Sequence, residues 1–233
     1  MEGGSMYRDS VRLATVAFWT VLGSALAGCS DAEFGESVSV PQERHASLLD
    51  DFAAGRPLVL PGDMVFNVAD AQRSSTAAGR AESNADPSGS AHCLASADGV
   101  GTATAEFQLG QVLDNRGRNP LKVTVRMEVE YECRLESNPA DTSKPEDQLG
   151  LRVFVRDSDQ RIPHRMMLTD AGSLAGPSRW TGRQSPSFDV TLEPGLAYYF
   201  VLAGRVAVTG TETSSASARI DVRSLKIELT PRK

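Results

Sequence analysis

The sequence predicts an all-β protein, an antiparallel β-sandwich of about seven to nine strands that follows an N-terminal signal helix and a flexible tether. The main observation is a period-two alternation of apolar and polar residues from residue 101 onward, typical of strands with one buried and one wet face. A second is the size and composition of the chain, whose 233 residues are 40% hydrophobic. These values are sufficient for a large core and argue against wholesale disorder.

The clearest strand covers residues 121–135. Its odd-numbered positions are apolar or aromatic from Leu121 to Leu135, and its even-numbered positions are charged or threonine. A helix would repeat its apolar residues every three to four positions, so this alternation excludes a helix. The same period appears at residues 103–109, 149–155 and 188–192.

Two further strand segments lie near the C-terminus. Glu193-Pro194-Gly195 is typical of a turn and leads into residues 196–208, which are dense in aromatic and β-branched residues, so we predict a hairpin here. The last segment alternates over 216–222 and again over 225–229 with a slip of one residue, which predicts a β-bulge near Arg223-Ser224. The run EPGLAYYFVLAG followed by SASARIDVRSLKIEL resembles the jelly-roll sandwiches of bacterial surface proteins. That resemblance implies a fold and no catalytic residues.

The N-terminus has the parts of a secretory signal over residues 1–28. Arg8 and Arg12 precede an apolar stretch, 13–27, which is shorter than the roughly 20 residues that a permanent membrane helix needs. Met1 and Met6 both remain possible starts. The stretch ends in Leu26-Ala27-Gly28-Cys29, with small residues at the expected cleavage site.

Leu26-Ala27-Gly28-Cys29 resembles the lipobox of bacterial lipoproteins. The resemblance implies that the lipoprotein signal peptidase cuts between Gly28 and Cys29, and that the Cys29 thiol carries a diacylglycerol. Acyl chains contribute about 0.8 kcal/mol per buried CH₂, so two or more would hold the chain on a membrane without crossing it. Because Ser30 follows the cysteine in place of aspartate, we expect the outer membrane to be favoured.

The remaining chain divides into a tether, residues 29–56, and one sandwich domain, residues 57–231. Within that domain, residues 68–98 are rich in Ala, Ser, Gly and Asp and contain almost no large apolar residue. We therefore predict a long mobile loop at about 68–98.

Cys93 and Cys133 are the two cysteines that remain after lipidation. In a chain sent to an oxidising compartment we predict that they form a disulfide, worth about 4 kcal/mol in the chain-entropy model; two separately buried thiols are the alternative. No CxxC or HxxxH spacing completes a tetrahedral metal site. Asp157-Ser158-Asp159 carries oxygens that suit Ca²⁺, but the same residues are ordinary turn formers, and we expect no cofactor.

Two aromatic residues are candidate sugar contacts. Trp180 lies in a Gly/Ser/Pro-rich segment, and Tyr199 is opposite in phase to Tyr198 and Phe200. Together they could form a stacking platform, although core or loop-anchor roles are the simpler interpretation.

Catalytic motifs are not evident: the sequence contains no GxSxG, HExxH, P-loop or Rossmann fingerprint. Glu128, Glu130 and Glu132 share one face of one strand and could supply glycosidase carboxylates. Arg126 and Arg134 flank them on that face, so we expect a solvated charged surface instead.

Charge narrows the class of partner. Thirty acidic residues against 24 lysines and arginines give a net charge of −6, which disfavours duplex nucleic acid and anionic lipid surfaces. We expect a non-catalytic structural or interaction module of the bacterial envelope, with an envelope protein or a glycan as partner. The alternative is a carbohydrate-binding or Ca²⁺-dependent lectin-like module, and a glycan-active hydrolase is the third hypothesis.

Overall fold

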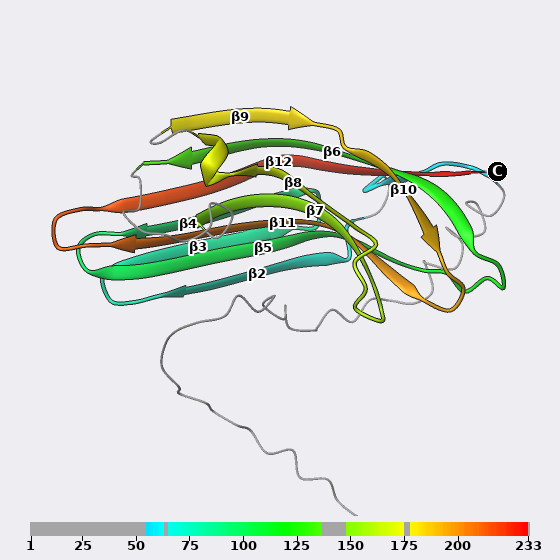
Figure 1. Ribbon diagram of the computed structural model, residues 1–233, viewed down its shortest axis with the longest axis horizontal. Coiled ribbons are helices and arrows are strands. Elements are labelled where there is room, and N and C mark those ends of the chain that lie inside the picture. Colours follow the sequence, from blue (N-terminus) through cyan, green and yellow to red (C-terminus); the bar gives the residue numbers. More distant parts are fainter. Residues whose placement is uncertain (1–54, 63–64, 137–147, 175–177, 233) are drawn as a thin grey trace, which may run out of the picture. The chain divides into compact units, whose positions relative to one another are not determined.

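The computed structural model describes residues 55–62, 65–136, 148–174 and 178–232, all within one compact unit, Val38–Lys233. These residues form twelve strands and one short 3₁₀ helix, η1 (Ala171–Leu174) (Figure 1). The strands are β1 (Leu58–Leu60), β2 (Val68–Ser75), β3 (Gly79–Asp86), β4 (Ser90–Ala97), β5 (Gly101–Asp114), β6 (Leu121–Leu135), β7 (Leu149–Asp157), β8 (His164–Asp170), β9 (Ser178–Gln184), β10 (Ser187–Leu192), β11 (Ala197–Gly210) and β12 (Ala216–Pro231). Within this described part, no helix has the length and apolarity to cross a bilayer.

The strands form two antiparallel sheets. Sheet A has the order β10-β6-β12-β4-β3, with β9 also paired to β6 and β1 to β12, and sheet B has the order β2-β5-β11-β7-β8. From β4 onward, sheet A therefore contains β4, β12, β6 and the β9/β10 pair, and sheet B contains β5, β11, β7 and β8 (Figure 1). If β9 and β10 are counted as one strand position, these are two four-stranded layers in the order of a jelly roll, with β1, β2 and β3 as additional strands. The predicted fold class is confirmed.

The core lies between the two sheets and follows the predicted alternation. On β6, the odd-numbered side chains from Val123 to Cys133 are fully buried against residues of sheet B such as Phe107 and Phe200. On β12, the pairing register shifts between Val222 and Ser224, so the predicted bulge is confirmed.

The prediction of a mobile loop at 68–98 is wrong, because this segment contains β2, β3 and β4. Strand β4 turns only small side chains inward, namely Ala91, Cys93, Ala95 and Ala97, and all four are buried. Large rings from other segments, including Phe66 and Phe107, belong to the same core cluster. Small residues can therefore line a strand when the volume is filled from elsewhere, and these three strands take the total above the expected number.

The hairpin predicted at Glu193-Pro194-Gly195 is also wrong. Strand β10 pairs with β6 in sheet A, whereas β11 pairs with β5 and β7 in sheet B. The turn, with Gly195 at φ 79°, carries the chain from one sheet to the other. Local turn chemistry indicates where the chain reverses, but it does not specify which strand each arm will pair with.

The predicted Cys93–Cys133 disulfide is not formed, and both cysteines are free and buried. Cys93 on β4 and Cys133 on β6 both lie opposite Ile220 of β12, one on each side. Two strand spacings separate them by about 10 Å, beyond the roughly 4.4–6.8 Å between Cα atoms that a disulfide requires. Burial raises the pKa of both thiols, that of Cys133 to about 12, so neither is a reactive thiolate.

We predict that a reducing agent leaves the thermal unfolding midpoint of the protein unchanged, because no bond between Cys93 and Cys133 is available to break. In denaturant without reductant, both thiols should react with an alkylating reagent, which peptide mass spectrometry detects. A lower midpoint after reduction, or a Cys93–Cys133 peptide pair that resists alkylation, would show that the bridge exists.

One long edge of the sandwich is closed by side chains from both sheets. His164 of β8 stacks on Phe188 of β10 with ring centroids 3.5 Å apart. Nearby, the Gln184 amide on β9 donates to the Tyr131 hydroxyl at 2.8 Å and to the Leu168 carbonyl of β8 at 2.9 Å. These contacts join β8 to β9 and β10 where no backbone ladder connects the two sheets.

Candidate functional site

Charged side chains form cross-strand rows on the outer side of sheet A. Arg219 of β12, Arg134 of β6 and Arg179 of β9 lie directly opposite one another in the strand register. The next row places Asp221 of β12 opposite Glu132 of β6. Like charges directly opposite on neighbouring strands are unfavourable, so this arginine row needs compensation from the adjacent row.

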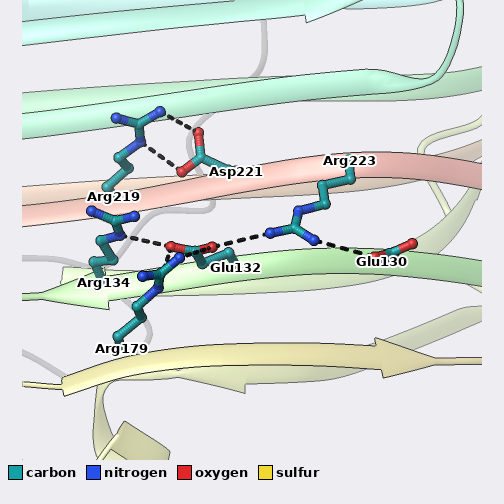
Figure 2. A network of polar contacts seen from close by, with 7 residues as sticks. All are labelled: Glu130, Glu132, Arg134, Arg179, Arg219, Asp221 and Arg223. Carbon is teal, nitrogen blue, oxygen red and sulfur yellow. Dashed lines mark hydrogen bonds and ion pairs between the residues drawn. The ribbon is translucent and has the colours of Figure 1, made fainter.

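Glu132 supplies most of that compensation. Its side chain is only 5% exposed, and its Oε1 atom lies 2.7 Å from both Arg134 Nε and Arg179 Nε. Its Oε2 atom accepts from Arg179 Nη2 at 2.9 Å and from Arg223 Nη2 at 3.3 Å. Figure 2 shows the three arginines converging on this carboxylate from β6, β9 and β12.

The neighbouring ion pairs extend the network along the strands. Arg219 binds Asp221 through two contacts of 2.6 and 2.7 Å, and Arg223 also lies 3.5 Å from Glu130. We define the arginine face by ten residues: Arg126, Arg134, Arg179, Arg183, Arg219, Arg223, Glu128, Glu130, Glu132 and Asp221. Its six arginines exceed its four carboxylates by two positive charges, whereas the whole chain has a net charge of −6. Sheet A thus carries a locally cationic surface.

The environment of Glu132 determines its protonation state. Hydrogen bonds from Arg179 and Arg134 lower the pKa of this carboxyl to about 2, against the opposing effect of burial. A glycosidase general acid needs the opposite shift, a raised pKa that keeps the proton near neutral pH. Glu132 remains ionised at physiological pH and is suited to holding cations in place.

The expectation of a fully solvated glutamate face needs correction at Glu132. Glu130 is 43% exposed, as expected, but Glu132 is buried by the arginines around it. Two of these, Arg179 and Arg223, come from β9 and β12, far away in the sequence. Alternation within one strand indicates which side a residue faces but not which neighbouring strand covers it.

The two candidate sugar contacts do not lie on one platform. Tyr199 is on the outer side of sheet B, where the Arg156 guanidinium lies over its ring at 4.8 Å and covers a face that a sugar would need. Trp180 is on β9 of sheet A, opposite Cys133 in the register, and is 49% exposed. Burial raises the pKa of the Tyr131 hydroxyl, and a side-chain hydrogen bond with Trp180 partly opposes that shift.

The aspartates considered as weak Ca²⁺ ligands, Asp157 and Asp159, instead form hydrogen bonds and ion pairs within the β7–β8 turn. Asp157 Oδ1 accepts from the backbone N–H groups of Asp159 and Arg161, both at 2.9 Å. Its Oδ2 atom lies 2.7 Å from Arg161 Nε, and the same arginine lies 3.3 Å from Asp159. No group of three or more potential metal-binding side chains occurs among the residues that the structure describes.

The lipidation site falls outside the described residues. Cys29 and the signal peptidase recognition residues Leu26, Ala27 and Gly28 all precede residue 55, where the description begins. Lipidation, membrane attachment and outer-membrane placement therefore stay predictions from the sequence.

Comparison with known proteins gives only weak structural likenesses. No protein-family model matches the chain, and no curated protein matches it. A solved structure described as "Structural basis for the promiscuous specificity of the carbohydrate-binding modules from the beta-sandwich super family" aligns over 66% of this chain at 11% identity and a TM-score of 0.21. The chain spans 55% of that structure's chain, and a likeness at this level indicates no function.

Proposed function

We propose that this chain is a non-catalytic interaction module of a bacterial envelope, held at the membrane by lipid on Cys29, with the arginine face as its recognition surface. The observation that supports this most is the sharing of one buried carboxylate by three arginines. Glu132 holds the guanidinium groups in fixed positions while most of each arginine side chain stays outside the core. Groups that are ordered before binding lose less entropy when a ligand arrives.

The charge arrangement supports recognition over catalysis. Glu132 is ionised and engaged with arginines, and Glu128 is shared between Arg126 at 3.0 Å and Arg183 at 3.8 Å. A pair of glycosidase carboxylates would need one proton-bearing and one ionised member with room for a sugar between them. Carboxylates already bound by arginines are better suited to positioning those arginines.

A crosslinking experiment in native membranes tests this function. Thr181 is exposed on β9 and lies opposite Glu132 on the arginine face, whereas Thr209 is exposed on the outer side of sheet B. With a photo-crosslinking residue at position 181 of the full chain, we expect a covalent adduct with an envelope component. The adduct should disappear when Arg134 and Arg179 are changed to glutamine. Equal adducts from positions 181 and 209, or none from 181, would contradict the assignment.

A second candidate function, binding of neutral sugars, is supported by the exposed Trp180 indole at the edge strand β9. Loss of binding to a neutral glycan in Trp180→Ala, with unchanged binding in Tyr199→Phe, would support it. Binding of no neutral glycan by the unchanged protein would reject it.

A further inference from the structure

The arginine row keeps hydrogen-bond donors available for a ligand. Arg134, Arg179 and Arg219 have side chains that are 42%, 61% and 43% exposed. Arg134 donates a hydrogen bond to Glu132 through its Nε atom alone. Within the described part of the chain, its two Nη atoms have no partner. Arginine binds carboxylate and phosphate through paired N–H groups, so such free ends suit an oxyanion.

The row also has a defined direction and length. Its three arginines sit on adjacent strands, β12, β6 and β9, in register, so neighbouring members are about 4.8 Å apart and the row extends about 10 Å across the sheet. Several acidic groups placed along one polymer chain could therefore contact the row together. A single small anion would use only part of it.

A carboxylate beside the row restricts the kind of polyanion that fits. Asp221 lies two residues from Arg219 on β12, in the next row on the same side of the sheet, and its side chain is 26% exposed. Its oxygens repel a dense line of phosphates but accept hydrogen bonds from hydroxyl groups. An acidic sugar carries carboxylate and hydroxyl groups on one ring and so matches both the arginines and Asp221. The net charge of −6 further disfavours duplex DNA.

We propose that the row of Arg219, Arg134 and Arg179 binds a carboxylate-bearing polysaccharide, whose acidic groups contact the arginines and whose hydroxyl groups contact the adjacent Asp221. This inference rests on the proposed function and specifies the class of partner.

Calorimetric titration with polygalacturonate tests the proposal. The fully methyl-esterified polymer, which has the same backbone without the negative charges, is the control ligand. We expect binding of the acidic polymer only, and binding about tenfold or more weaker in Arg134→Gln/Arg179→Gln. The control Arg116→Gln/Arg156→Gln removes the same charge away from the face and should bind as the unchanged protein does. If thermal unfolding shows that the Arg134→Gln/Arg179→Gln variant is not folded, binding is measured with Arg219→Gln instead, which should also weaken it. Arg219 hydrogen-bonds to Asp221, so its replacement leaves the contacts of Glu132 intact.

Any one of the following results would overturn the proposal: equal binding of the esterified polymer, equal loss in the control pair, or duplex DNA binding as tightly as polygalacturonate at the same ionic strength. No binding of polygalacturonate would also reject it. If crosslinking from position 181 still depends on Arg134 and Arg179 in that case, the arginine face keeps its proposed function with a different partner.

Discussion

Replacing Gly204 with alanine is expected to lower the free energy of unfolding by about 1–3 kcal/mol. Gly204 faces the core from β11, directly opposite Phe107 of β5. A Cβ atom at this position would lie closer than 3.0 Å to both Cε1 and Cζ of the Phe107 ring, a separation that real Cβ atoms essentially never show. The Phe107 ring is buried at the centre of the sandwich, so it has little room to move away.

Urea unfolding of Gly204→Ala and of the double variant Gly204→Ala/Phe107→Leu measures this effect. A smaller side chain at position 107 is destabilising alone because it leaves a cavity, but it should relieve the clash with a methyl group introduced at position 204. The double variant is therefore expected to be more stable than the sum of the two single changes predicts. A midpoint for Gly204→Ala equal to that of the unchanged protein, or strictly additive effects, would show that Phe107 does not occupy this space.

Replacing Glu132 with glutamine is expected to lower the unfolding temperature at pH 7 by several degrees. The substitution removes the negative charge that Arg134, Arg179 and Arg223 share, and the opposed Arg134 and Arg179 lose their compensation. Glu130→Gln is the matched control. Glu130 is more exposed and has one ion pair at 3.5 Å, so its loss should have little effect.

The dependence on pH separates this charge effect from a change in packing. The folded-state pKa of Glu132 is about 2, below the ordinary value of 4.5. Its contribution to stability is therefore complete above pH 4.5 and is lost as the pH falls towards 2. The difference in unfolding temperature between the unchanged protein and Glu132→Gln should shrink over this interval. A difference that persists at pH 2, or none at pH 7, would contradict the network.

The strand pattern makes the β-sandwich predictable in the C-terminal half. Alternation over 121–135 specifies which side chains of β6 face the core, and the slip at Arg223-Ser224 specifies the bulge. Both are properties of a single segment. Strands β2 to β4 lack such a signal because they contribute small side chains to a core whose volume is filled by rings such as Phe107.

Only the part of the candidate site that lies on β6 could be predicted from the sequence, because the local pattern describes one strand at a time. The alternation of β6 places Glu132 and Arg134 on one outer face. Arg179 and Arg223 join them through strand pairing, and pairing partners do not appear in the local pattern. Strand order also separates Cys93 from Cys133, since β12 lies between their strands. Two residues can each face inward and still be two strands apart.

The most direct test of the arginine face as the recognition surface is an NMR measurement of the arginine Nε–Hε resonances during addition of a soluble glycan fraction from a bacterial envelope. We expect the resonances of Arg134, Arg179 and Arg219 to shift with increasing ligand, while that of Arg156, stacked on Tyr199 in sheet B, stays in place. A shift at Arg156 with no change at the other three would locate recognition on sheet B and contradict the assignment to the arginine face.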